Sequence, residues 1–481
     1  MRELLEVRIA YTTVILYTII MSAEHYLSPE QKIETIEAIV LKNPVVAGLE
    51  SYEYLRNDSV KQEQAFSSGE QARLVLTYPD ITVAAIDEVK QPMLAALVAL
   101  MPGEMNDRTI HLYYAIEYRY SELFLLDMVR TLNSTEVTDE DRTEARNWFV
   151  MANESLYGKP DQEVFNALAA KNLFSLLEKR SGDNKTTSSL RTELQELVGS
   201  VMPTDFEPFT PDEELVSRVG ELVHERFDEL VEHIDPERTY EVEVMREALD
   251  IALDKIGGKD VGWKTVVVSN SSVLAVSAHQ KQVEVGENRK AINGDVLRGK
   301  VLHEVGVHAG RSINAERVGW LSAAYGQNGY LDFEEAFATS LEDAYKGKFK
   351  EHGVNYYMVA GLAYGLDDHE PRDLRETFDV MWRIKALDRV KEGQITEEDV
   401  AIAKSNAFIS VMRLFRGTTG TDKGVVYLKD MAYFNGQELA WGVLKNVQSQ
   451  HDFDYLFAGK LDNSKPDHQR IARLIVDNQT R

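Results

Sequence analysis

The strongest chemical signal in the sequence is the string HEVGVH at residues 303–308, which places two imidazoles and a carboxylate between apolar residues. With 11 histidines in 481 residues, such an HExxxH string is expected about 0.02 times in a random chain of this composition. Two neutral imidazoles, a third protein ligand and a water form a typical catalytic zinc site. Glu304 is then placed to take a proton from that water and to protonate the leaving amine. The alternative is a helix whose two histidines make structural hydrogen bonds only.

The spacing of the two histidines predicts a distorted helix. His303 and His308 stand five positions apart, which is about 140° on an ideal helix and too wide for both rings to meet one ion. A single π-bulge widens the turn and brings both rings onto one face, and Gly306 lies where such a bulge is tolerated.

A third ligand is expected from a second helix. The segment LDFEEAFATSL at residues 331–341 carries two adjacent carboxylates, Glu334 and Glu335, inside an apolar run. They could equally cap the helix or pair with Arg311 or Arg317, so spacing alone leaves ligand and structural roles open.

Two further acids follow on the same predicted helix. Glu342 lies one helical repeat beyond Glu335, and Asp343 follows it. Both are weaker candidates, either as ligands or as hydrogen-bond partners of a ligand.

The elements around these residues predict an α+β fold that is mostly helical, with a small β-sheet beside a zincin-like active-site helix. Three short β-branched runs, at 265–268, 272–277 and 282–285, are typical of strands. Asn293 or Asp295 can then cap a helix that leads into the histidines.

The first part of the chain is expected to be helical from about residue 28 to residue 178, because its apolar residues recur at helical spacing. Polar residues at 180–191 and prolines at 203, 208 and 211 mark a boundary. We therefore expect a hydrophobic extension at 1–23, a helical region at 24–200 and a catalytic domain at 201–481.

Residues 201–260 carry 18 acidic and 6 basic side chains, which is typical of solvated helix faces.

Composition excludes several classes of function. The formal net charge of −26 repels phosphate backbones and acidic membrane surfaces, so neither nucleic acid nor a membrane is an expected partner. The chain has no cysteine, so a metal must be held by His, Asp or Glu.

The run IAYTTVILYTIIMSA at residues 9–23 is uncharged but shorter than the roughly 20 residues of a membrane-spanning helix. Three interpretations stay open: an extension upstream of a true start at Met21, an uncleaved hydrophobic helix or anchor, and a secretory signal. A cytoplasmic protein is the expectation.

Four ordered motifs carry a resemblance to a known family: HEVGVHAGRSINAE, FEEAFATSLED, VMRLFRGTTG and VVYLKDMAYFNG. Together they resemble the metallopeptidases that include the microtubule-associated tyrosine carboxypeptidases and the bacterial flavohemoglobin expression-modulating proteins with a QEGLA motif. The resemblance covers about residues 156–436.

This resemblance implies a zinc-dependent carboxypeptidase with His303, His308 and Glu335 as zinc ligands and Glu304 as catalytic base. The chain departs from the QEGLA pattern, since Glu334, Ala336 and Phe337 stand where the family has glutamine, glycine and leucine.

A carboxypeptidase needs a cation for the terminal carboxylate of its substrate. Arg413, Arg416 and Lys429 lie in the segments that resemble the family, and an arginine fork suits a carboxylate. Tyr433 could donate a hydrogen bond to the oxyanion. The alternative for each is an ordinary surface or packing residue.

Two other functions fit part of the pattern. A regulatory or binding protein could retain the fold without turnover, but it would be free to lose Glu304. A dipeptidyl peptidase of the HExxxH type leaves the segments RLFRG and KDMAY unexplained.

The expected partner is the C-terminus of a peptide or protein, and the resemblance favours release of an aromatic residue. An acidic chain is badly suited to the acidic tail of tubulin. The sequence carries no signal for an oligomeric state.

Overall fold

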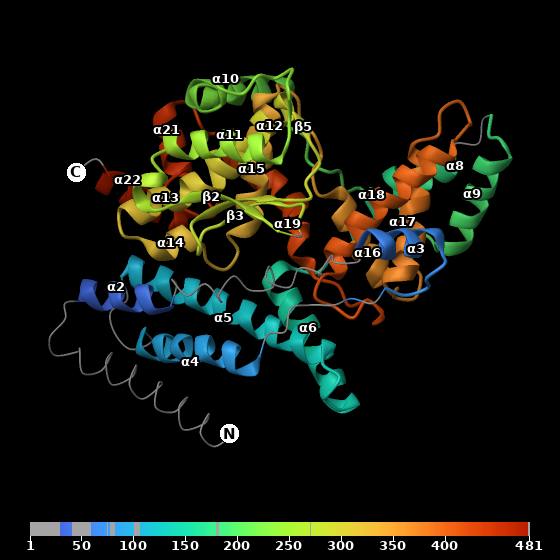
Figure 1. Ribbon diagram of the computed structural model, residues 1–481, viewed down its shortest axis with the longest axis horizontal. Helices are drawn as coiled ribbons and strands as arrows, with labels where there is room; N and C mark the ends of the chain where they lie inside the picture. Colours follow the sequence, from blue (N-terminus) through green and yellow to red (C-terminus); the bar gives the residue numbers. More distant parts are fainter. Residues whose placement is uncertain are drawn as a thin grey trace.

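A computed structural model describes residues 29–40, 59–74, 76, 82–100, 106–178, 182–269 and 271–479. It confirms a mostly helical α+β protein with a small sheet (Figure 1). The hydrophobic run at 9–23 lies outside the described residues. No helix within the described ranges is long and apolar enough to cross a membrane.

The predicted strands are confirmed and form a small mixed sheet. Strands β2 (Lys264–Val268), β3 (Leu274–Ser277) and β4 (Gln282–Gly286) are ordered β2-β4-β3. β4 pairs parallel with β2 and antiparallel with β3. Strands β1 (Thr239–Tyr240) and β5 (Ile292–Asn293) form a separate antiparallel pair just before the histidine helix.

The helix that carries the histidines is one continuous rod made of three parts. It consists of α12 (Gly294–Val301), the π-helix η6 (Leu302–Ala309) and α13 (Gly310–Arg317). Asn293 caps its start, because its side chain accepts a hydrogen bond from the backbone of Val296. Of the two predicted caps, Asn293 is therefore the one used.

Helices surround this rod and the sheet beside it. In Figure 1, α10 and α11 lie above the sheet. The bounds in this region are α10 (Glu213–Val231), α11 (Val242–Lys255), η5 (Lys259–Val261), α14 (Leu321–Tyr325) and α15 (Leu331–Tyr345). Strand β3 packs on η6, and α15 crosses η6, so that its acids face the histidines.

Helices from separate stretches of the chain, including α3, α8 and α9 and, much later, α16 to α18, form a second group on the right of Figure 1. There α3 and α9 pack against α18 and α17. The C-terminal bounds are α16 (Val354–Tyr364), α17 (Leu374–Asp388), α18 (Glu397–Phe415), η7 (Leu428–Met431), α19 (Ala432–Asn435), α20 (Gln437–Leu444), α21 (Gln450–Leu456) and α22 (Pro466–Gln479).

The first part of the chain is mostly helical over its described residues, as predicted. Its bounds are α2 (Pro29–Val40), α3 (Ser59–Ser68), α4 (Val83–Leu100), α5 (Asp107–Asn133), α6 (Asp139–Tyr157), α7 (Gln162–Ala169), η4 (Ala170–Phe174), α8 (Ser175–Glu178) and α9 (Lys185–Leu197). Helix α9 starts inside the polar stretch at 180–191, because Asn184 caps it.

One core cluster runs from Ile33 to Phe457, so the first helices share buried apolar surface with the region around the histidines. A second, smaller cluster joins α14 to α22. The boundary near residue 200 stays a prediction about how the chain is organised.

Candidate metal centre

The two histidines converge because the helix widens at the position that the sequence predicted. Residues 302–309 form a π-helix, and the rings of His303 and His308 lie 4.7 Å apart between centroids. Ligand atoms of these two residues and of Glu304 all lie within 4.8 Å of one another. The expected π-bulge is therefore confirmed.

Gly306 has a reason beyond the widened turn. A Cβ atom at this position would lie 3.0 Å from the ring of Phe227 on α10, which is closer than side chains normally pack. The missing side chain lets α10 close over the helix that carries the histidines.

Glu335 completes a three-atom cluster. Its Oε2 atom lies 3.9 Å from His303 Nε2 and 3.7 Å from His308 Nε2. That oxygen is buried and has no hydrogen-bond partner among the described residues. A buried carboxylate oxygen without a partner is costly, so its position against two imidazole nitrogens fits a cation held by all three.

The far side of each imidazole is held by another carboxylate. His303 Nδ1 lies 2.6 Å from Glu342 Oε1, and His308 Nδ1 lies 2.8 Å from Glu334 Oε1. An ionised carboxylate only accepts hydrogen bonds, so each Nδ1 carries the proton and each Nε2 keeps its lone pair. This is the arrangement by which proteins orient histidine ligands of a metal.

Charged neighbours keep both of these carboxylates ionised. Burial opposes ionisation of Glu342, but His303 and Lys300, whose Nζ lies 2.9 Å from Glu342 Oε1, hold its pKa well below the usual range. Burial also acts on Glu334. The hydrogen-bonded guanidinium of Arg311, the charge of Lys460 and the hydrogen bond from His308 outweigh burial and lower the pKa of Glu334 to about 2.

Glu304 differs from the two carboxylates that hold the histidines. Burial raises its pKa to about 7, His303 and Lys300 offset only part of that rise, and two neighbouring carboxylates add to it. A carboxyl group that ionises near neutral pH can accept and return a proton. Arg289, on the loop after β4, also acts electrostatically on Glu304. Nothing in the sequence pattern pointed to Arg289.

Tyr433 and Arg413 lie next to the cluster. The Tyr433 hydroxyl hydrogen-bonds to Glu335, and burial together with the Glu335 charge raises the pKa of Tyr433 well above its usual value. Arg413 donates to the same hydroxyl over 3.4 Å and to Tyr356 over 3.2 Å. Tyr356 was missed from the sequence because α16 carries no motif.

The three predicted cations are not equivalent. Asp430 binds both arginines, with Arg413 Nε at 3.0 Å and Arg416 Nη2 at 3.1 Å. The Arg413 side chain is 38% exposed and the Arg416 side chain 19%. Lys429 is only 13% exposed, with Nζ 3.8 Å from Glu122 Oε1 on α5. Arg413 is therefore the predicted cation that is both accessible and linked to the histidine cluster.

The remaining acids and bases singled out in the sequence have structural partners. Arg311 pairs with Glu334, as one of the structural alternatives predicted. Arg317 instead donates to backbone oxygens of residues 256 and 257. Asp343 accepts hydrogen bonds from His352 and from the backbone of Lys350, so it organises the loop after α15 instead of joining the cluster.

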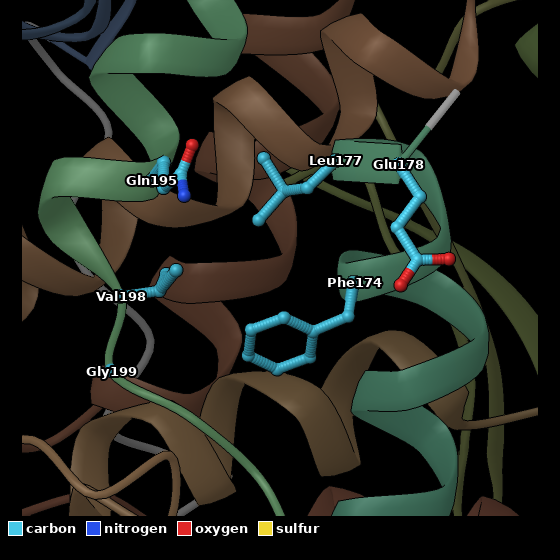
Figure 2. Close-up of a pocket in the computed structure, with 6 residues that line it drawn as sticks. All are labelled: Phe174, Leu177, Glu178, Gln195, Val198 and Gly199. Carbon is cyan, nitrogen blue, oxygen red and sulfur yellow. The ribbon is translucent and has the colours of Figure 1, made fainter. Parts of the chain in front are cut away.

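A cavity of about 430 Å³ lies elsewhere, between α8 and the end of α9. Figure 2 shows its lining residues, which are Phe174, Leu177, Glu178, Gln195, Val198 and Gly199. This lining holds no cation for a carboxylate and no histidine for a metal. The cavity is therefore separate from the chemistry of the histidine cluster.

Comparison of the chain with protein-family models, with curated proteins and with solved structures yields no match. The assignment of the centre therefore depends on its geometry and on the motifs in the sequence.

Proposed function

We propose that the protein is a zinc-dependent peptidase that removes residues from the C-terminal end of a peptide or protein. The observation that carries this proposal is the convergence of Glu335 Oε2, without a hydrogen-bond partner among the described residues, on the Nε2 atoms of His303 and His308. Two imidazoles and one carboxylate are a ligand set found in catalytic zinc sites. When bound, zinc supplies Lewis-acid activation of water and of the peptide carbonyl.

The residues of the chain then have distinct roles. Glu304 takes a proton from the attacking water and passes it to the leaving amine, which suits a carboxyl group with a pKa of about 7. Tyr433, at the edge of the cluster, turns its single O–H from Glu335 to the oxygen on which negative charge develops and donates a hydrogen bond to it.

The carboxypeptidase assignment depends on Arg413. Its guanidinium is held by Asp430 through Nε, and its side chain is more exposed than that of Arg416 or Lys429. An arginine held in this way can bind a substrate carboxylate through its outer nitrogens. The rings of Tyr356 and Tyr433 lie 5.1 and 5.4 Å from the guanidinium. They offer an aromatic surface to the released residue, in keeping with the aromatic preference that the resemblance implies.

The test compares matched peptides with zinc-loaded wild-type protein. Each peptide is offered as a free acid, as a C-terminal amide and with an acetylated N-terminus, and products are identified by mass spectrometry. We expect loss of C-terminal residues from the free acid, little effect of acetylation, and a drop in kcat/KM of about 10- to 100-fold on amidation, the scale of one charge-assisted hydrogen bond. Internal or N-terminal cuts would reject the carboxypeptidase assignment, and no cleavage of any peptide would reject the peptidase.

A further inference from the structure

A buried lysine approaches the centre from the C-terminal segment of the chain. Lys460 is 8% exposed, and its backbone nitrogen donates to Ala323 over 2.7 Å. Its Nζ lies 3.7 Å from Glu334 Oε1. Lysine is rarely this buried in a folded protein, so the contact that its charge makes requires an explanation.

The two oxygens of Glu334 have different partners. Oε1 accepts the hydrogen bond from His308 Nδ1 and faces Lys460. Oε2 accepts from Arg311. One arginine is enough to balance the charge of Glu334, so Lys460 adds a second positive charge at the oxygen that His308 uses.

Both cations also bind the centre to the C-terminal segment. Arg311 Nη2 donates to Leu461 O over 2.6 Å and to Asn463 Oδ1 over 3.1 Å. Lys460 belongs to that segment itself. The C-terminal segment is therefore connected to His308 through one carboxylate, that of Glu334.

We propose that Lys460 tunes the metal affinity of the centre, acting through Glu334 on His308. A cation close to Glu334 Oε1 reduces the negative potential that this oxygen produces at His308 Nδ1. A weaker acceptor at Nδ1 makes Nε2 a weaker donor to a metal. Lys460 is thus a positioning residue that lowers zinc affinity, and the C-terminal segment is part of the centre. This inference rests on the zinc site of the proposed function, and not on turnover.

The test measures zinc dissociation constants of metal-free full-length protein by competition with a chromophoric chelator. Lys460→Met should bind zinc several-fold more tightly than wild type. Glu334→Gln should bind about 10- to 100-fold more weakly, the usual cost of losing an outer partner of a histidine ligand. Lys465→Met is the matched control, because Lys465 is 45% exposed and its Nζ lies 3.2 Å from Asp462 instead. Its affinity should stay within about twofold of wild type.

The opposite signs of the first two variants distinguish tuning from a merely structural role. If Lys460 only supported the fold, Lys460→Met would weaken zinc binding as Glu334→Gln does, and that result, or an unchanged constant, overturns the inference. If Lys460→Met does not fold, Lys460→Gln replaces it with the same expectation. A wild type that binds zinc but cleaves nothing defeats the proposed peptidase and leaves this test intact, whereas a wild type that binds no zinc overturns both.

Discussion

Two buried glutamates of the centre show how their neighbours set the charge of a carboxyl group. Burial raises the pKa of Glu304 to about 7, since its neighbours His303 and Lys300 offset only part of that cost. Burial acts on Glu334 as well, but Arg311 and Lys460 help to bring its pKa down to about 2. Glu304 can therefore exchange a proton near neutral pH, while Glu334 remains a permanent hydrogen-bond acceptor for His308.

The first prediction at the residue scale concerns metal content. We expect about one zinc per chain after reconstitution. His303→Ala should lose this zinc, because the two protein ligands that remain are too few to hold it. Elemental analysis after desalting measures this. His352→Ala is the control, since His352 is bound to Asp343 outside the cluster. Undiminished zinc in His303→Ala contradicts the ligand assignment.

The second prediction separates chemistry from metal binding. Glu304→Gln should keep its zinc and its fold but lose about 100- to 10,000-fold in kcat, because an amide cannot accept the proton of the attacking water. Steady-state kinetics on a cleaved peptide measure the loss. Glu221→Gln, an exposed position on α10, should behave as wild type. Comparable turnover in Glu304→Gln shows that another group is the base.

The third prediction identifies the cation that binds the substrate carboxylate. Arg413→Met should lower kcat/KM for free-acid peptides by about 10- to 100-fold and hardly change it for amidated ones, because only free acids present the charge. Arg416→Met should cost less, since Arg416 acts through Asp430. Arg389→Met, which removes a surface pair with Asp399, is the control. Equal losses on both kinds of peptide would mean that Arg413 serves the fold or the chemical step.

At the scale of elements, the centre depends on one distorted helix and on what packs against it. The π-helix η6 turns two histidines toward α15, whose acids include a neighbour of each imidazole. Helix α10 covers the same rod where Gly306 leaves room for Phe227. The widened turn and this close approach both occur within residues 302–309.

The prediction at this scale is that Gly306→Val destabilises the protein by about 1–3 kcal/mol, the usual cost of overpacking a core. The added side chain meets the Phe227 ring, so either α10 or η6 must shift. Urea unfolding of the metal-free protein measures the effect. Gly310→Ala on the same rod is the control, since its Cβ meets only Val305 O at an ordinary 3.4 Å, and it should be neutral or stabilising. Equal stability of the two variants contradicts the packing role of Gly306.

At the scale of the whole molecule, the C-terminal segment and α15 bring like charges together. Burial raises the pKa of Asp332 to about 7, and the nearby charge of Asp462 adds to the rise while Lys465 opposes it. The folded state therefore holds a proton on Asp332 at pH values where the unfolded chain, with a pKa of roughly 3.9, does not. Stability from this group is complete below about pH 4 and is lost as the pH rises to about 7.

The fifth prediction follows from that sign. Asp332→Asn should be more stable than wild type by on the order of 4 kcal/mol at pH 8, and the difference should vanish near pH 4. Chemical unfolding at several pH values measures it. Asp205→Asn, at an exposed position, should leave the pH dependence unchanged. A difference that is constant with pH would trace the effect to packing.

Two buried histidines, His111 and His468, change the stability with pH in the direction opposite to Asp332. Their effect cancels when wild type is compared with Asp332→Asn. Burial lowers the pKa of His111 to about 3 and that of His468 to about 4. Their contribution to stability is therefore lost as the pH falls below about 6.5. Because wild type and Asp332→Asn share both histidines, only the difference between them reports on Asp332.

The sequence by itself determined the features that depend on local spacing. The HExxxH string, the widened turn between its histidines, the Asn293 cap and the three strands follow from residue types within a few positions of one another. Local propensity and side-chain direction act over that range, so these features could be predicted.

Only the tertiary structure decided which distant side chains meet. Glu334 and Glu342 accept hydrogen bonds from the imidazoles of His308 and His303. Arg413 lies next to the cluster through its contact with Tyr433. Lys460 lies close to Glu334 although more than a hundred positions of the chain separate them. Such contacts depend on how helices cross and on which face each one buries, and spacing along one helix carries no information about either. The partners that set the charge and direction of each group in the centre are therefore a product of packing.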